Sequence, residues 1–409
     1  MTARHLLHPL RAARALQSKI SAHLHIASFA YHGRRRFRRD NRYNLEHVSI
    51  GFLSRLDTRN DDKSILARIC DAYCAAVQEL TKAQGAPTTD WSSGSSDPRL
   101  SRVRQALLAR DLPALAQMYG NFYRDACSSG LLGAPGGLAK AYFSGNISDL
   151  YRHFYLSHVL YRLDYWKEIT RGRYPLQALR GPGIGNPFGV VIEGIHVSVG
   201  AEYAHYCAQR VMEQLDRDDA TVVEIGGGFG GIAYYLLRDR PGTRYIDIDI
   251  PEYLALAAYY LMKAFPHLNV LLYREGALSR ESLSKADIVL VPRAALSQLP
   301  PDCADLTYTS HGMATLSSAA TRQCMHGVSR ITRKRLFFIS NRGPAANISG
   351  IIQDQEARFE LKETSESGWH SHKISGAGVG GATMREASTL VEQSYDRSDH
   401  PTASQSARS

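Results

Sequence analysis

The sequence of 409 residues predicts an α/β protein, in which a mostly parallel sheet with flanking helices follows a helical N-terminal domain. Three observations support this fold class. Helical periodicity dominates residues 46–185. Beyond residue 186, short apolar runs alternate with helix-length segments, which is typical of parallel strands joined by crossover helices. A glycine-rich turn follows one of these runs directly, at residues 226–231.

The N-terminal arm, residues 1–45, holds most of the charge. Residues 1–50 contain ten Lys and Arg against two acids, and so account for eight of the ten net positive charges. The rest of the chain is nearly neutral, which argues against a nucleic-acid-binding fold. The arm is amphipathic and rich in arginine, and this pattern is compatible with three roles. The arm is a solvated segment ahead of the fold, a segment that contacts an anionic surface through residues 34–39, or a targeting peptide. We expect a flexible arm with weak anionic-surface contact.

The helical domain is predicted over residues 46–185. Within it, apolar residues recur every four positions from Ile65 to Val77, as in an amphipathic helix. Residues 147–170 are rich in aromatic side chains, which serve either as core or as a platform for stacking a sugar; Tyr151, Tyr155 and Trp166 are the candidates for acceptor contacts. The glycines and prolines of residues 181–189 predict a stiff turn, interpreted as the hinge between the domains.

The second domain is predicted over residues 186–392, and a disordered tail over 393–409. Six cysteines are scattered without a CxxC pair, which predicts reduced thiols in a cytoplasmic protein and no metal site. No apolar stretch is long enough to span a membrane. The oligomeric state is not predicted. The expected strands are residues 221–225, 244–249, 269–273, 288–291, 306–309 and 336–340.

The glycine turn is the most informative segment. Glu224 lies near the end of a buried strand, and Gly226, Gly228 and Gly230 follow before a helix begins at residue 232. Glycine accepts positive φ angles and lets the backbone approach a ligand closely, and a helix N-terminus adds N–H donors. Because Gly226, Gly228 and Gly231 also match GxGxxG, an NAD(P)-dependent oxidoreductase is an alternative.

Two acidic residues near the glycine turn indicate which kind of nucleoside ligand the turn binds. Asp249 ends the strand that follows the glycine turn, where a carboxylate suits the two hydroxyls of a ribose. Asp247 has the same parity and is the alternative. Glu224 stands where a dinucleotide-binding strand usually has an apolar residue, and it would complement a cationic ligand.

The segment VVEIGGGFGG (222–231) resembles motif I of class I S-adenosylmethionine-dependent methyltransferases, and IDIPE (248–252) resembles the strand end that O-methyltransferases use for the cofactor ribose. Over roughly residues 60–345 the chain resembles a bacterial sugar O-methyltransferase family. This resemblance implies a Rossmann-like fold and S-adenosylmethionine as cofactor. It implies Glu224, Gly226, Gly228 and Gly230 around the methionine part and the 5′ side of the adenosine, with Asp249 on the ribose. The implied reaction is methyl transfer to a hydroxyl of a sugar or glycan-related acceptor.

Two positions depart from the family pattern. Arg293 stands after the strand 288–291, where many relatives place an acid near the adenine, so an adenine contact by Arg293 or by the backbone stays open. The segment around His311 replaces an acidic or amide-bearing one. His311 directly follows a strand at the carboxyl edge of the sheet, where ligands of open α/β folds bind.

A sugar hydroxyl is a poor nucleophile, so a base near it is expected to help. His311 is our candidate for the catalytic base, and a histidine satisfied by backbone or solvent is the alternative. The second glycine run, residues 376–381, is expected to be a flexible loop. A basic-armed RNA-binding or RNA-modifying protein is a further alternative function.

Overall fold

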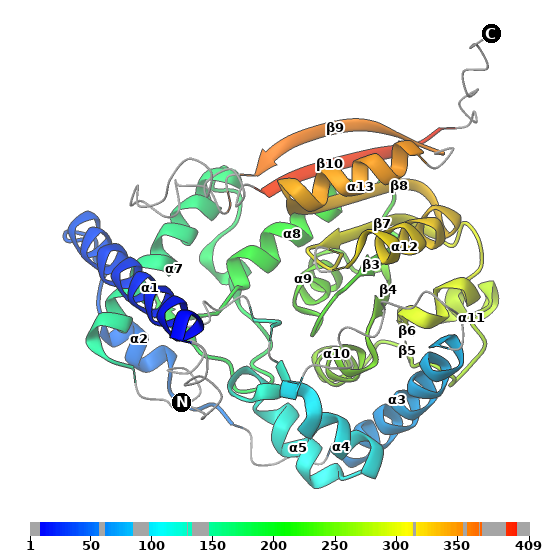
Figure 1. Cartoon of the computed structure of the whole chain (residues 1–409), viewed down its shortest axis with the longest axis horizontal. Helices are drawn as coiled ribbons and strands as arrows, with labels where there is room; N and C mark the ends of the chain where they lie inside the picture. Colours follow the sequence, from blue (N-terminus) through cyan, green and yellow to red (C-terminus); the bar gives the residue numbers. More distant parts are fainter. Residues whose placement is uncertain are drawn as a thin grey trace.

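The computed structural model describes residues 9–56, 62–84, 98–128, 130–132, 147–313, 316–354, 358–367, 369 and 390–398. Its centre is an eight-stranded sheet in the order β5-β6-β4-β3-β7-β8-β10-β9 (Figure 1). The strands are β3 (Thr221–Ile225), β4 (Arg244–Asp249), β5 (Val270–Leu271), β6 (Ile288–Pro292), β7 (Ala304–Ser310), β8 (Thr332–Asn341), β9 (Phe359–Ser367) and β10 (Leu390–Arg397).

The sheet is parallel from β5 to β8, whereas β10 runs antiparallel to both β8 and β9. The predicted α/β class with a mostly parallel sheet is therefore confirmed. All six predicted strands are present. The predicted tail from residue 393 is wrong over 393–397, because these residues belong to β10 and Gln393, Ser394 and Tyr395 are buried. The sequence there is polar, and the strand is held by ladder hydrogen bonds on both sides.

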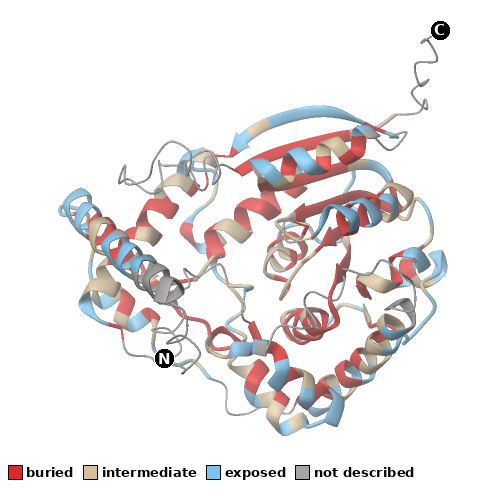
Figure 2. Cartoon of the chain, in the orientation of Figure 1, coloured by how far each residue is buried: buried red, intermediate tan, exposed pale blue. Residues whose placement is uncertain are grey.

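Two apolar cores cover the two faces of the sheet. Successive side chains of a strand point to opposite faces. Val222 and Tyr245 therefore join one core with α8 (Ala201–Glu213), α9 (Gly231–Asp239) and α10 (Pro251–Ala264). Val223 and Ile246 join the other core, which includes residues of α11 (Arg280–Lys285), α12 (Ser318–Ile331) and α13 (Arg342–Asp354). Both faces of the parallel strands are thus buried (Figure 2).

The N-terminal region is helical, as predicted. Its helices are α1 (Pro9–Arg36), α2 (Glu46–Gly51), α3 (Lys63–Gln84), α4 (Ser101–Ala109), α5 (Leu112–Gly120) and α7 (Asp149–Ile169). Short 3₁₀ turns are η3 (Pro98–Leu100), η4 (Phe122–Arg124), η5 (Ala126–Ser128), η6 (Leu176–Leu179) and, after β6, η7 (Arg293–Gln298). A hairpin of β1 (Gly189–Ile192) and β2 (Ile195–Ser198) joins this region to α8. Tyr119, Phe122 and Trp166 of this region lie in the same core as α8 to α10.

The predicted flexible arm differs from the structure. Residues 9–36 form α1, which lies along α7 (Figure 1). Phe29 is buried, and its ring centroid lies 5.3 Å from that of Phe154 and 5.4 Å from that of Tyr161. Phe37 is buried as well. The basic composition of the arm does not indicate that two of its aromatic side chains, Phe29 and Phe37, are buried and hold its second half against the rest of the protein. Among the described helices, none is long and apolar enough to cross a membrane.

Candidate functional site

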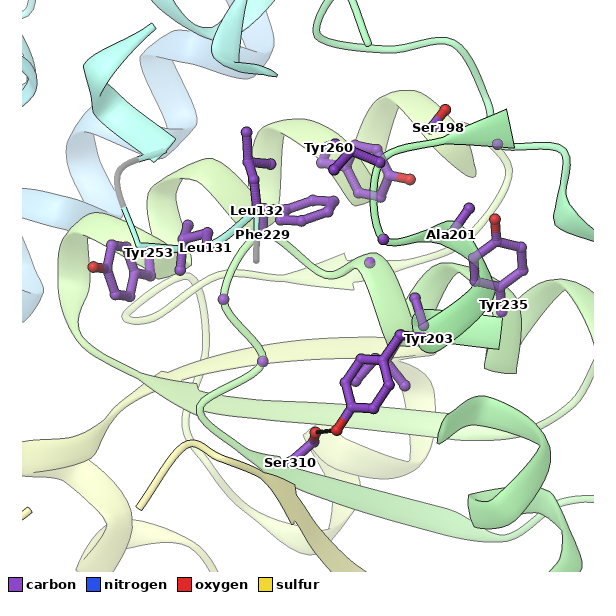
Figure 3. Close-up of a pocket in the computed structure, with 18 of the residues that line it drawn as sticks. Leu131, Leu132, Ser198, Ala201, Tyr203, Phe229, Tyr235, Tyr253, Tyr260 and Ser310 are labelled. Atoms are coloured by element: carbon purple, nitrogen blue, oxygen red, sulfur yellow. Dashed lines mark hydrogen bonds between the residues drawn. The ribbon is translucent and has the colours of Figure 1, made fainter. Parts of the chain in front are cut away.

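A cavity of about 560 Å³ opens at the carboxyl edge of the sheet. Its walls come from the ends of β3, β4 and β7, from the glycine turn, from α8 and from residues 181–184. In the view of Figure 3, Leu131 and Tyr253 lie on the left, Ala201 and Tyr235 lie on the right, and Tyr203 and Ser310 lie below them. The predicted site residues Glu224, Gly226, Gly228, Asp249 and His311 all line this one cavity.

The glycine turn is shaped by close backbone contact and by positive φ. Gly226 has φ +81°, and a Cβ there would lie 2.6 Å from the Cα of Gly312. The strand ends of β3 and β7 therefore touch through two glycines. Gly228 has φ +64°, lines the cavity, and would bring a Cβ within 3.2 Å only of the tip of Leu131. Gly230, in contrast, begins α9 against Leu261, and the structure does not place it among the lining residues.

Asp249 holds the turn in place from β4. Its Oδ2 accepts a hydrogen bond from the Gly228 amide at 3.0 Å, and its Oδ1 accepts one from the Ile250 amide at 2.7 Å. The Arg293 guanidinium donates to the same Oδ1 at 3.1 Å. A carboxylate offers about four acceptor positions. One position on Oδ2 therefore has no donor among these three groups.

Asp247 also binds the glycine turn, but its side chain lies outside the cavity. Its Oδ1 accepts a hydrogen bond from the Gly227 amide at 3.1 Å, so the two acids of β4 hold two consecutive amides of the turn. The carboxyl group of Asp247 is fully buried beneath the turn and does not line the cavity. Burial, together with the nearby Asp249 and Glu224 carboxylates, raises the pKa of Asp247 well above its usual range.

Glu224 has an unusual proton affinity. Its side chain is buried at the end of β3, and the Tyr245 hydroxyl donates to its Oε2 at 2.6 Å. Burial raises the pKa of Glu224 to about 7, because removal from water disfavours the ionised form more than the tyrosine hydrogen bond favours it. The group thus changes its charge near neutral pH.

His311 stands at the end of β7 in a strained conformation. Its φ is +64°, which costs energy in a residue with a Cβ, and its amide donates to the Ile339 carbonyl oxygen at 3.1 Å. Burial lowers the pKa of His311, so its imidazole is neutral at pH 7. The Tyr203 ring lies 6.3 Å from the His311 ring, and the Tyr203 hydroxyl shares a hydrogen bond of 2.8 Å with Ser310 (Figure 3).

The aromatic residues expected to contact an acceptor lie elsewhere. Tyr155 and Trp166 are buried in the core, and neither they nor Tyr151 line the cavity. From the same helix α7 the structure brings Arg162 to the cavity wall, where its Nε lies 3.0 Å from a Glu202 carboxylate oxygen. Helical periodicity in α7 gave no signal that would single out Arg162.

The segment 181–189 is part of the site rather than a free hinge. Residues 181–184 line the cavity, and Asn186 is buried, with its amide nitrogen donating to the Asn121 side chain at 2.7 Å. The density of glycine and proline predicted a stiff turn in this segment. It did not predict contact with the cavity, because that contact depends on how the helical region packs against the sheet. The glycine run at 376–381 lies outside the described residues. Within the described part of the chain, no cluster of three His, Cys, Asp or Glu residues would hold a metal ion.

No protein-family model matches the sequence, and no curated protein matches it. Solved structures with a similar fold include the following three. A SAM-dependent methyltransferase from Aquifex aeolicus is 12% identical, with a TM-score of 0.32 over 57% of this chain and 98% of that one. Magnesium protoporphyrin IX methyltransferase from Synechocystis is 14% identical, with a TM-score of 0.33 over 59% and 97%. The cyclase SpnF is 13% identical, with a TM-score of 0.34 over 49% and 83%.

At these identities and scores, the function has to be argued from the site itself. The sheet itself is parallel from β5 to β8, and β10 runs antiparallel to both of its neighbours.

Proposed function

We propose that the protein is an S-adenosylmethionine-dependent O-methyltransferase that acts on a hydroxyl of a sugar or glycan-related acceptor. One observation carries the proposal. Gly228 and Asp249 meet on the wall of a cavity at the carboxyl ends of two adjacent parallel strands, and Glu224 faces the same cavity. This is the place where open α/β folds bind nucleoside ligands.

The residues present fit such a cofactor. The remaining acceptor position on Asp249 Oδ2 would take one ribose hydroxyl, and the position now used by Arg293 on Oδ1 would take the second. Gly228 lines the cavity, and only the tip of Leu131 lies within 4 Å of a Cβ placed there. An ionised Glu224 would complement the positive charge of a methionine ammonium group.

The cavity lining around the end of β7 suits an acceptor. S-adenosylmethionine supplies, when bound, a methyl group on a positively charged sulfur. The chain must therefore orient a hydroxyl and remove its proton. His311 is the proposed base, because burial lowers its pKa and favours the neutral imidazole, and Ser310, Tyr203 and Arg162 add polar groups to the lining of the cavity. The sugar class of the acceptor rests on the sequence resemblance to a sugar O-methyltransferase family over roughly residues 60–345.

Calorimetric titration with S-adenosylhomocysteine, and in parallel with NAD and NADP, tests the cofactor class. We expect micromolar binding of S-adenosylhomocysteine alone, followed by methyl transfer to a sugar in an acceptor screen. Binding of a nicotinamide cofactor instead would overturn the proposal in favour of an oxidoreductase.

Replacing Asp249 with asparagine is expected to weaken S-adenosylhomocysteine binding by about 1–3 kcal/mol, roughly 5- to 150-fold. Asparagine keeps the shape but loses acceptor positions that the ribose needs. Asp247→Asn is the matched control. Asp247 holds the neighbouring amide and does not line the cavity. Equal affinities of the two variants in calorimetry would reject Asp249 as the ribose ligand.

The pH dependence of binding is expected to follow Glu224. Because the pKa of the Glu224 carboxyl group is about 7, the group is mostly protonated below that pH, and only its ionised form complements a cation. Affinity for S-adenosylhomocysteine should therefore rise with pH up to pH 7, by at most about tenfold per unit, and then level off. The pKa of Glu224 is higher in the folded state than in the unfolded state. Its contribution to the free energy of unfolding therefore decreases as the pH rises from about 4.5 to 7, while the affinity for the ligand increases. In Glu224→Gln both dependences should vanish, measured by calorimetry and by thermal unfolding. A variant that kept the wild-type pH profile would remove Glu224 from the binding site.

A further inference from the structure

The outer face of α1 is apolar and exposed. Ile20, Leu24 and Tyr31 are 52%, 63% and 63% exposed. Their spacing places them on one side of the helix, since 3.6 residues make a turn. Phe29 lies on the opposite side, against α7. In Figure 2 the pale outer face of α1 points away from the body of the protein.

Such exposure is concentrated in this part of the molecule. Among the described residues, six of the eight large apolar side chains that are exposed lie between residues 20 and 56. A soluble surface usually exposes large apolar side chains singly, and a gathering of them marks an interaction site. The face has a fixed orientation, because Phe29 and Phe37 anchor α1 to the core.

Arginine side chains without an acidic partner among the described residues lie at the C-terminal end of this face. Arg34 and Arg35 follow Tyr31 by three and four residues, which places them beside it on the helix surface. Together with Arg38 and Arg39 they are exposed, and none of these four forms an ion pair with a residue that the structure describes. Arg36, in contrast, lies 3.9 Å from the Asp164 carboxylate.

We propose that the outer face of α1, with Ile20, Leu24 and Tyr31 flanked by the cluster of Arg34, Arg35, Arg38 and Arg39, binds the surface of a membrane that contains anionic lipids. The apolar side chains would enter the headgroup region, and the arginines would contact lipid phosphates. The inference goes beyond the proposed methyl transfer and does not depend on it.

The side-chain chemistry favours a lipid surface over the other partners. Single-stranded RNA is bound by aromatic stacking and cations, whereas Ile20 and Leu24 offer no stacking surface. A second copy of the chain would bring the same unpaired arginines with it, and no complementary acidic cluster lies on the exposed face of α1. Lipids supply both an apolar layer and negative charge.

Co-sedimentation of the full chain with vesicles tests the proposal. We expect binding to phosphatidylcholine vesicles that contain phosphatidylglycerol, weaker binding to phosphatidylcholine alone, and partial loss at high salt. Leu24→Glu/Tyr31→Glu should reduce binding at least tenfold. Arg34→Ala/Arg35→Ala should reduce it by about fivefold per arginine. Leu108→Glu is the matched control, because Leu108 is 55% exposed on α4, away from α1, and it should bind as the wild type does.

Thermal unfolding and S-adenosylhomocysteine affinity of each variant, measured without vesicles, separate this surface from the fold and from the proposed active site. Absence of wild-type binding to the anionic vesicles would overturn the proposal. So would equal losses in the Leu108 control. RNA binding or self-association that disappears in the Leu24/Tyr31 variant, without vesicle binding, would assign the face to a different partner.

Discussion

Gly228→Val is expected to abolish S-adenosylhomocysteine binding, with at least about a 100-fold loss of affinity. The position lines the cavity and has open space where a side chain would stand, apart from the tip of Leu131. A valine would fill the volume assigned to the cofactor and bring a branched Cβ to the turn that Asp249 holds. The loss should be visible by calorimetry as absence of heat at ligand concentrations that saturate the wild type.

Valine at φ +64° also strains the backbone, by about 1–3 kcal/mol. Gly172→Val separates this strain from the loss of space, because Gly172 has φ +65° and nothing lies within 4 Å of a Cβ placed there. The two variants should lose similar thermal stability, and only Gly228→Val should lose the ligand. Normal binding by Gly228→Val would show that the turn is not the cofactor loop.

His311→Ala is expected to lower methyl transfer by about 10²- to 10⁴-fold while S-adenosylhomocysteine affinity stays within about threefold. The imidazole is the proposed base, and burial keeps it neutral and ready to accept a proton. At saturating cofactor, where the pH dependence of binding attributed to Glu224 no longer limits the rate, the wild-type rate should fall as pH drops through the His311 pKa, which burial lowers. That acid limb should be missing from the residual activity of the variant.

His311→Asn is the companion variant, because asparagine tolerates a left-handed φ and preserves a polar side chain without a basic nitrogen. Both variants should lose turnover alike if proton removal is the role. If Asn restores most of the rate, His311 has a hydrogen-bonding rather than a basic function. Wild-type turnover in Ala would exclude it from the mechanism.

Local patterns were sufficient to predict the six parallel strands of the sheet, β3 to β8. The glycine turn, the acids at the ends of β3 and β4, and the strand limits of β3 and β4 follow from short apolar runs bounded by Gly, Asp and Pro. These features depend on neighbours along the chain. Proximity of Gly228 to Asp249 follows as well, because parallel strands end at one edge.

Features that depend on distant residues could not be predicted in this way. Arg293 pairs with Asp249 across two strand ends, and Gly312 touches Gly226 from β7. Neither contact has a local signal. The strands β9 and β10 are not predicted by local patterns. The polar sequence of β10 becomes a buried strand only between β8 and β9, and the Arg210 guanidinium of α8 pairs with its Glu392 carboxylate at 2.8 Å. The packing of the arm has no local signal either, because its basic composition does not indicate that Phe29 and Phe37 are buried.

The place of β10 also constrains the order in which the protein is assembled during synthesis. β10 lies between β8 and β9 and pairs with both, yet it is translated after both. Until residue 397 has emerged from the ribosome, β8 presents an unpaired edge and β9 has no neighbour in the sheet. An open strand edge recruits other chains. Nascent chains paused between β9 and β10 should thus be the stage most dependent on chaperones, and a premature stop in that interval would yield an aggregating product rather than a shortened folded protein.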